Sequence, residues 1–240
     1  RKRFDEGLIE GGIVKLIKRP FRDEFERLNK LDISDKNVED FLKACEKYKV
    51  KPMTTIFTRD VVKKTFSQGF KNIKLSSFDC ISIPLAEDIL EFDPELLIVS
   101  TGCSFKNEIK AMAKVLNQTY KTAMLHCTSI YPTPLHEANL NRIDFLKEII
   151  PRVGLSDHSC SDVDGLEIIK WAICKEIEFI ERHFTILPKD QTKDGKVSLN
   201  PTEFKQVYEI TNWDKNEKER FLNGKKEIGL LVNGDKNREL

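Results

Sequence analysis

Two histidines occupy positions at which α/β enzymes often carry their chemistry. His158 follows the apolar segment 153–155, and His183 lies near the end of the apolar segment 179–184. Both segments are typical of buried strands, and each histidine is expected at the start of a loop. If the two strands are neighbours in a parallel sheet, both imidazoles emerge at its carboxyl-end face. Two imidazoles there can share one divalent metal ion.

The other predicted strands also end in polar residues. A single serine at such a point is usually a turn residue, and a single buried histidine is usually a satisfied core group. Six successive polar strand ends are harder to explain by turns alone, and one lysine among several hydroxyls suits a phosphate and a carboxylate. The residues are Thr54, Thr55, Lys74, Ser76, Ser77, Asp79, Ser100, Thr101, Thr128, Ser129, Tyr131, Ser156, Asp157, Glu181 and Arg182.

The hydrophobic pattern from residue 34 onward alternates between strand and helix periods. We predict strands over 51–57, 73–76, 96–100, 123–127, 153–155 and 179–184, each with a helix after it. Ser34 can cap the helix before the first strand, and Asn200, Pro201 and Glu203 are suited to begin the last helix. This repeat predicts a parallel sheet of about six βα units. The first 30 or so residues are expected to be a long loop.

Both an open doubly wound sheet and a (β/α) barrel fit this repeat. No Gly-x-Gly-x-x-Gly turn follows a strand, which disfavours a dinucleotide fold, and a closed barrel needs two more strands than the pattern provides. A cysteine nucleophile is a competing hypothesis, because Cys127 adjoins His126. However, no Gly-x-Ser-x-Gly elbow is present, and Cys127 is most simply a small core residue at the end of an apolar strand.

The composition excludes some classes of protein. The 240 residues include 40 Lys and Arg against 39 Asp and Glu, so a general nucleic-acid or membrane-surface partner is not expected. No apolar stretch approaches the roughly 18 residues of a membrane span. The 6 cysteines are scattered, without the pairs of a zinc site or the density of a secreted scaffold. We expect a cytoplasmic protein with reduced cysteines.

Several motifs of this chain resemble the N-acetylneuraminate (sialic acid) synthase family. The resemblance extends from about residue 51 to residue 204, in family order and at near-family spacing. It implies an α/β fold, the (β/α)8 TIM-type barrel. It also implies condensation of phosphoenolpyruvate with an N-acetylhexosamine, N-acetylmannosamine or a related sugar, to a nine-carbon 2-keto sugar acid and phosphate. The motifs are Lys74-Leu75-Ser76-Ser77-Phe78-Asp79, Ile98-Val99-Ser100-Thr101-Gly102, residues 125–134, Gly154-Leu155-Ser156-Asp157-His158 and Ile180-Glu181-Arg182-His183-Phe184-Thr185.

The resemblance also implies roles for individual residues. His158 and His183 match the family's ligands for a divalent metal, Mn²⁺ or Mg²⁺, and Asp79 matches an acidic position beside the reacting carbons. Ser129 stands where many members have asparagine, and Asp79 where some have glutamate, so both bear on which sugar fits. The positions that contact phosphoenolpyruvate are Thr55, Lys74, Ser77, Ser100 and Ser156, and those that hold the amino sugar are Ser129, Tyr131 and Asp194.

The resemblance covers a barrel without its first two strands, so we expect a piece of a longer synthase that is inactive by itself. The family exchanges C-terminal domains between subunits, which implies a homodimer for the longer protein. We divide the chain into a connector (1–33), a partial barrel (34–213) and a charged tail (214–240). Two alternatives remain: a non-catalytic relative that binds a phosphorylated ligand or a partner chain, and another metal-dependent aldolase or lyase on the same barrel.

Overall fold

The computed structural model describes residues 8–10, 13–15 and 21–234, and the chain divides into two compact units. The first unit ends at Lys51 and the second begins at Pro52. We expected a boundary after residue 33. The helix that follows Ser34 therefore groups with the N-terminal unit, and the strands of the predicted barrel group with the second unit.

The N-terminal unit contains strands where we expected a loop. β1 (Leu8–Glu10) pairs antiparallel with β2 (Ile13–Lys15), and Ile9 lies opposite Val14. The prediction of a loop was wrong because three-residue strands are too short to show a period. The sequence between them, Gly11-Gly12, is nevertheless one that favours two-residue hairpin turns.

Two helices complete the described part of this unit. α1 (Phe21–Asn29) was not predicted, since its polar sequence hides the apolar period; an ion pair of 3.1 Å joins Arg22 to Glu26 one turn later. α2 (Asp35–Lys47) begins as predicted, because the Ser34 hydroxyl accepts a hydrogen bond of 3.2 Å from the Asn37 N–H.

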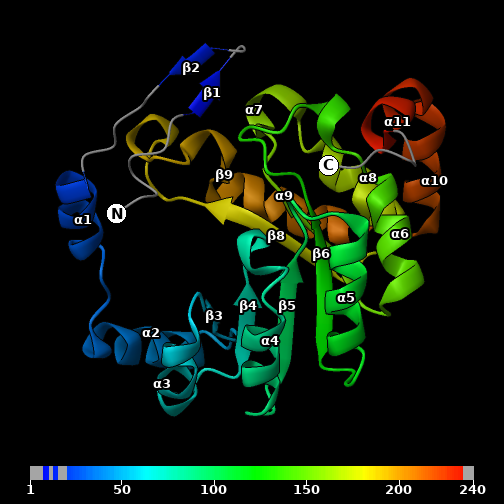
Figure 1. The fold of residues 1–240 in the computed structure, drawn as a ribbon. Coiled ribbons are helices and arrows are strands. Elements are labelled where there is room, and N and C mark those ends of the chain that lie inside the picture. The colour runs from blue at the N-terminus through cyan, green and yellow to red at the C-terminus, as the bar shows by residue number, and fades with distance from the viewer. Residues whose placement is uncertain (1–7, 11–12, 16–20, 235–240) are drawn as a thin grey trace. The chain divides into compact units, whose positions relative to one another are not determined.

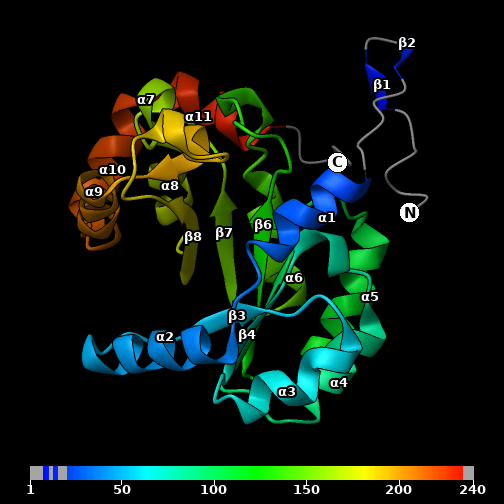
Figure 2. The same ribbon diagram turned by 90° about the vertical axis from the view of Figure 1, so that its left-hand side faces the viewer.

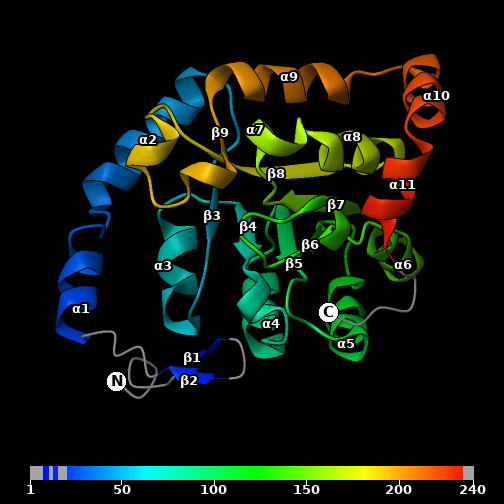
Figure 3. The ribbon, with the colours of Figure 1, turned by 90° about the horizontal axis from the view of Figure 1, so that it is seen from above.

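The second unit is built on a curved parallel sheet that follows chain order (Figure 1). Within the described residues it has seven strands: β3 (Met53–Thr55), β4 (Asn72–Leu75), β5 (Leu96–Ser100), β6 (Thr122–Cys127), β7 (Val153–Asp157), β8 (Phe179–Phe184) and β9 (Ser198–Leu199). The six predicted strands are confirmed, and β9 is an addition too short to predict. The order never reverses, as it would in a doubly wound sheet. Seen from above, the strands follow an arc (Figure 3).

Helices cover the convex side of this arc (Figure 3). α4 and α5, for example, pack side by side on it (Figure 2). The helices up to residue 211 are α3 (Val62–Ser67), α4 (Ile83–Leu90), α5 (Lys106–Leu116), α6 (Asn141–Ile149), α7 (Ser161–Asp164), α8 (Glu167–Cys174) and α9 (Pro201–Thr211). Short 3₁₀ turns lie at Arg59–Val61, Ser77–Asp79, Leu135–Glu137, Lys189–Gln191 and Gly195–Val197. None of the helices in the described ranges is both long enough and apolar enough to cross a bilayer.

The start of α9 confirms a predicted cap. The Asn200 side chain accepts from the Glu203 N–H at 2.9 Å, and the Glu203 carboxylate accepts from the Asn200 N–H at 2.8 Å. Pro201 occupies the first turn, where its missing N–H costs nothing. The three residues therefore determine where the last predicted helix begins.

Alternation along the strands separates the two faces of the sheet. On the convex face, Ile73, Leu97, Val99 and Met124 are completely buried beneath the helices. Each such side chain contributes about 1.5–3 kcal/mol on burial. On the concave face, an apolar cluster contains Ile98, Ala123 and Leu125, with Met53, Leu96 and Phe179 packed against it. The concave side therefore has an apolar floor on which polar residues closer to the strands' carboxyl ends can stand.

The segment after residue 213 is helical, where we expected a charged tail. α10 (Lys215–Gly224) and α11 (Lys226–Asn233) turn back onto the helical layer. The Phe221 ring lies 5.3 Å from that of Trp171 on α8, and the Leu140 N–H donates to the Val232 carbonyl at 2.9 Å. The expectation failed because half of the residues of α10 are charged, whereas the segment is held by a few residues, among them Phe221 and the completely buried Val232.

A buried histidine lies on the convex face of β6. His126 is 1% exposed, and its Nε2 lies 2.7 Å from the Ala138 carbonyl. Burial, with smaller contributions from Arg142 and Lys175, lowers the pKa of His126 to about 4. The ring is therefore neutral near pH 7 and donates its Nε2 hydrogen to Ala138.

Two glycines, Gly224 on α10 and Gly229 on α11, should differ in how much stability changes when each is replaced by alanine. A Cβ at Gly229 would lie 2.3 Å from Cη2 of Trp171, whereas one at Gly224 meets nothing within 4 Å. We expect Gly229→Ala to lower the free energy of unfolding by about 1–3 kcal/mol through overpacking. Gly224→Ala, the matched control, is expected to be neutral or to stabilise by up to about 1 kcal/mol. Urea unfolding followed by tryptophan fluorescence measures both, and equal midpoints would contradict this packing.

His126 predicts a pH dependence of stability. Its pKa is about 4 in the folded chain and near 6.5 when unfolded, so the unfolded chain binds the extra proton between these pH values. The free energy of unfolding therefore falls as pH drops from 6.5 to 4, by up to about 3 kcal/mol from this group. His126→Gln keeps an N–H donor for Ala138 but cannot titrate. The difference in the free energy of unfolding between wild type and variant should narrow or reverse in sign as the pH is lowered. A difference independent of pH would refute the low pKa of His126.

Candidate functional site

The concave face places most of the predicted site residues together. Strand pairing aligns Thr55 with Lys74, Cys127 with Ser156, and Ser156 with Glu181. These residues alternate with the convex-face core, so their side chains share the concave side. Ser100 aligns with Leu125 of the apolar floor and belongs to the same face. The strands of the sheet thus supply four of the five residues expected to contact phosphoenolpyruvate: Thr55, Lys74, Ser100 and Ser156.

His158 and His183 lie next to each other, as predicted. β7 and β8 pair Asp157 with Arg182, and each histidine is the next residue along its chain segment. Their ring centroids are 5.3 Å apart, with an angle of 68° between the planes. Both therefore sit on the concave face at the carboxyl ends of adjacent parallel strands.

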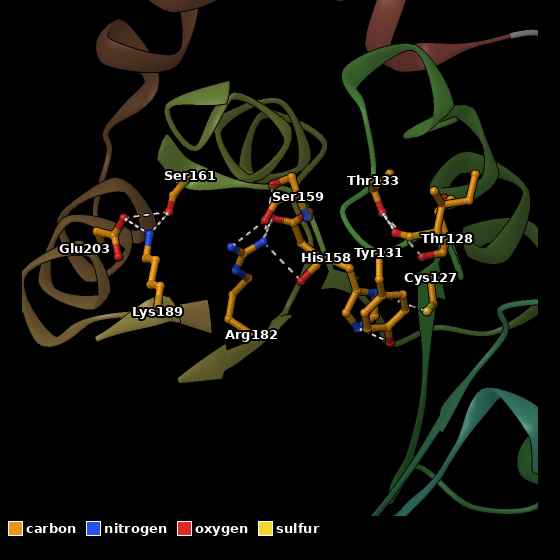
Figure 4. A network of polar contacts seen from close by, with 12 residues as sticks. Cys127, Thr128, Tyr131, Thr133, His158, Ser159, Ser161, Arg182, Lys189 and Glu203 are labelled. Carbon is orange, nitrogen blue, oxygen red and sulfur yellow. Dashed lines mark hydrogen bonds and ion pairs between the residues drawn. The ribbon is translucent and has the colours of Figure 1, made fainter. Parts of the chain in front are cut away.

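Tyr131 lies against His158 (Figure 4). Its ring stacks on that of His158 at 4.0 Å and meets that of His183 edge-on at 5.8 Å. The Tyr131 hydroxyl lies 2.7 Å from Nε2 of His158. His158 is only 4% exposed, so its ring lies beneath the tyrosine and does not line an open cavity.

The protonation states follow from the surroundings. Burial, the neighbouring His183 and the more distant Arg182 and Lys74 lower the pKa of His158 to about 3, against an opposing backbone hydrogen bond to Thr128. Partial burial raises the pKa of Tyr131. Near pH 7 the phenol therefore keeps its proton and donates it to the lone pair of a neutral His158 Nε2.

Lys74, Ser156 and Glu181 form a polar cluster on the apolar floor. The Lys74 ammonium lies 3.3 Å from Oε2 of Glu181, and the Ser156 hydroxyl donates to Oε1 at 3.1 Å. We gave Glu181 no role from the sequence. Its spacing was a usable signal, because a residue two positions before His183 on a strand must face the same side.

Cys127 also lies at the site, with its sulfur 3.8 Å from Nδ1 of His158. Burial raises the pKa of this thiol, so Cys127 stays protonated near pH 7. A protonated, buried thiol is a poor nucleophile. This geometry favours the interpretation of Cys127 as a packing residue and disfavours the cysteine-nucleophile hypothesis.

Three loops converge above the cluster at Gly102. A Cβ at this residue would lie 2.4 Å from Oγ of Ser129, 2.8 Å from Oγ of Ser77 and 3.1 Å from the sulfur of Cys127. The Gly102 N–H donates to the Ser77 hydroxyl at 3.2 Å. Only a residue without a side chain permits this approach, which brings the predicted Ser77 and Ser129 to one place.

The remaining predicted residues lie on loops. Asp79 follows β4, and one of its carboxylate oxygens accepts from the Ser76 hydroxyl at 2.6 Å. Tyr131 and Asp194 line one cavity of about 440 Å³, together with Pro132 and the side chains of Lys189, Lys193 and Lys196. Two of the three residues expected to hold the amino sugar, Tyr131 and Asp194, therefore border the same space.

The donor set fits a divalent metal in part. Within residues 21–234 and the short N-terminal strands, no three His, Cys, Asp or Glu side chains converge on one point. The rings of His158 and His183 are neighbours with centroids 5.3 Å apart, the low pKa of His158 keeps its lone pair free of a proton, and the Tyr131 hydroxyl lies 2.7 Å from its Nε2. Imidazole nitrogens suit a divalent ion that takes its other ligands from water or substrate.

Comparison with known proteins agrees with this geometry. A model of the NeuB family matches residues 17–219. An uncharacterized protein of Methanocaldococcus jannaschii, MJ1065, is 31% identical over 187 residues, which are 76% of this chain and 54% of that protein. The N,N'-diacetyllegionaminic acid synthase of Campylobacter jejuni is 28% identical over 77% of this chain and 55% of its own length.

A solved structure shares the fold. The sialic acid synthetase of Leptospira borgpetersenii, crystallised with citrate, superimposes with a TM-score of 0.70 at 23% identity, over 86% of this chain and 76% of that one. This likeness concerns the fold: a curved parallel sheet of the kind found in barrel proteins. The chain spans about half the length of the curated relatives it matches.

Proposed function

We propose that this chain, which belongs to the NeuB family, carries the site that condenses phosphoenolpyruvate with an N-acetylated amino sugar. The products would be a nine-carbon 2-keto sugar acid and phosphate. The observation that supports this most is the pair of adjacent imidazoles, His158 and His183, above a lysine on the same concave face. The relative named as an N,N'-diacetyllegionaminic acid synthase supports the same reaction class.

Lys74 and four hydroxyls would bind phosphoenolpyruvate. The lysine supplies a positive charge for phosphate or carboxylate, and Thr55, Ser77 and Ser156 can donate hydrogen bonds. Ser100 Oγ is buried and has no hydrogen-bond partner among the described residues, as expected of a group that awaits a ligand. Glu181 pairs with Lys74 at 3.3 Å, so an incoming anion would share this ammonium with the carboxylate or take its place.

Tyr131, Asp194 and Ser129 would hold the amino sugar. Tyr131 and Asp194 border one cavity. Ser129, on the loop that follows β6, lies beside Gly102. Asp79 would stand beside the reacting carbons as an acidic group, with Ser76 fixing its carboxylate. Hydroxyl and carboxylate groups of this kind can orient the sugar aldehyde toward the nucleophilic carbon of phosphoenolpyruvate.

His158 and His183 would hold Mn²⁺ or Mg²⁺. Such an ion, when bound, supplies Lewis-acid polarisation of the sugar carbonyl. Both imidazoles stand at the ends of adjacent strands, and the low pKa of His158 leaves that ring unprotonated near pH 7. Tyr131 must release Nε2 of His158 for this ring nitrogen to coordinate, and its phenol is then available to the sugar.

The cellular setting completes the proposal. All 6 cysteines are free, which suits a reducing compartment, so we place the protein in the cytoplasm. Its partners would be small-molecule substrates and a second copy of the longer protein, with no role for nucleic acid or membranes. Because this chain corresponds to only part of its relatives, the activity of the whole protein belongs to the proposal as well.

The histidine pair predicts a loss of metal-dependent activity. In a full-length protein that contains this chain, supplied with phosphoenolpyruvate, N-acetylmannosamine and Mn²⁺, we expect phosphate release and a nine-carbon product by mass spectrometry. His158→Ala should lower the rate by at least about a hundredfold, the scale of losing a main electrostatic contact. His136→Ala, whose side chain is 62% exposed on a loop, is the control and should be unchanged. An unaffected His158→Ala, or a product of a different class, would refute the proposal.

Lys74 predicts a selective change in KM. Charge-assisted hydrogen bonds contribute about 1.5–3 kcal/mol, so Lys74→Ala should raise the KM for phosphoenolpyruvate about tenfold or more. The KM for the sugar should change much less. Lys71→Ala is the control, because Lys71 lies just before the same strand and makes only an exposed pair with Glu95 at 3.4 Å. Equal shifts in both KM values would exclude the proposed phosphate or carboxylate contact.

A further inference from the structure

A buried ion pair lies on the convex face directly behind the histidines. Asp157 and Arg182 are register partners on β7 and β8, and each side chain is only 1% exposed. Nη1 of Arg182 bonds the Asp157 carboxylate and donates to the Asp157 carbonyl at 3.1 Å. Nη2 donates to the Ser159 carbonyl at 3.0 Å, and the Ser159 hydroxyl lies 3.3 Å from Nη1 (Figure 4).

This network holds the backbone on both sides of His158. The carbonyls of residues 157 and 159 accept from Arg182, and the carbonyl of His158 accepts from the Thr133 N–H at 2.9 Å. The Ser159 N–H and hydroxyl each donate to the Asp157 carboxylate at 2.9 Å. Three consecutive carbonyls are therefore occupied, which leaves the segment that carries the imidazole little freedom.

Stability alone does not account for such an arrangement. Two buried charges lose their hydration, and replacing a buried pair by apolar side chains is often neutral or stabilising. What a guanidinium provides is a planar set of donors that serves several acceptors at fixed angles. A lysine, with one small charged group, cannot reach the same acceptors in the same geometry. The network is therefore suited to define an orientation.

Strand alternation connects this orientation to the site. Asp157 and Arg182 point to the convex side, and the next residues, His158 and His183, point to the concave side. We propose that Arg182 is a positioning residue that fixes the imidazole of His158 against that of His183. The expected consequence is a change in the affinity of the two histidines for a divalent metal, and this part of the inference rests on the proposed function.

Affinity for Mn²⁺ tests the consequence. Free Mn²⁺ is measured by electron paramagnetic resonance in titrations of the 240-residue chain. Arg182→Met should weaken binding about tenfold to a hundredfold, the range found when groups that orient metal ligands are removed. Arg182→Lys should bind Mn²⁺ more tightly than Arg182→Met but less tightly than wild type. Arg152→Met is the matched control: Arg152 bonds Glu178 at 2.9 Å and joins the same two strands at their amino ends, so affinity should stay within about twofold.

Contacts between the rings test the positioning itself without metal. Wild type should show nuclear Overhauser effects between the rings of Tyr131 and His158, whose centroids are 4.0 Å apart, and Arg182→Met should weaken them. Gly229→Ala, destabilised at a distant site, should retain them, which separates positioning from general loss of stability. If Arg182→Met keeps both these contacts and wild-type Mn²⁺ affinity, the inference is overturned.

The two proposals fail in different ways. If wild type binds no Mn²⁺, the metal-dependent function is wrong, while the ring contacts still decide the role of Arg182. Should Arg182→Met not fold, Ser159→Ala removes one hydroxyl of the network and should weaken Mn²⁺ binding about fivefold, the effect of one hydrogen bond. Unchanged affinity and unchanged ring contacts in Ser159→Ala would overturn the inference as well.

Discussion

The pairing of β7 with β8 is the constraint on which the site depends. Because parallel strands in register turn equivalent residues to the same side, the pair Asp157 and Arg182 places His158 beside His183 on the opposite face. A shift of one residue would turn one imidazole into the helical layer. The proposed chemistry therefore depends first on the strand register, which places the two histidines side by side. The properties of the imidazoles themselves come second.

A second constraint is the division of the concave face into an apolar floor and a polar upper layer. Ile98, Ala123 and Leu125 exclude water from below, so the charges of Lys74 and Glu181 lie at the edge of a region of low polarity. In such surroundings an unpaired charge is costly, which explains both this ion pair and the neutral state of His158. Leaving the lysine unpaired would be unfavourable, so an anion that displaces Glu181 must itself pair with the ammonium.

The errors of sequence reasoning have a common physical origin. β1, β2 and β9 have three residues or fewer, half or more of the residues of α1 and α10 are charged, and α11 has only eight residues. Hydrophobic periodicity detects elements that repeat along the chain with a buried face, so it identified the six strands of the βα repeat, including the three-residue β3, and missed the other short or charged elements. Glu181 received no role for another reason: its spacing from His183 predicts the face of the sheet on which it lies, but its partner Lys74, four strands away, is known only from the structure.

The sequence by itself determined the parallel βα repeat, the six main strands, the capping of α2 and α9, the family and the candidate residues, because each rests on local spacing or on motifs. Only the tertiary structure decided which candidates meet. It placed Tyr131 over His158, paired Lys74 with Glu181, gathered Ser77 and Ser129 around Gly102, and put Asp157 and Arg182 behind the histidines. These contacts join residues far apart in the chain, and their geometry depends on how the sheet curves, which no local pattern encodes.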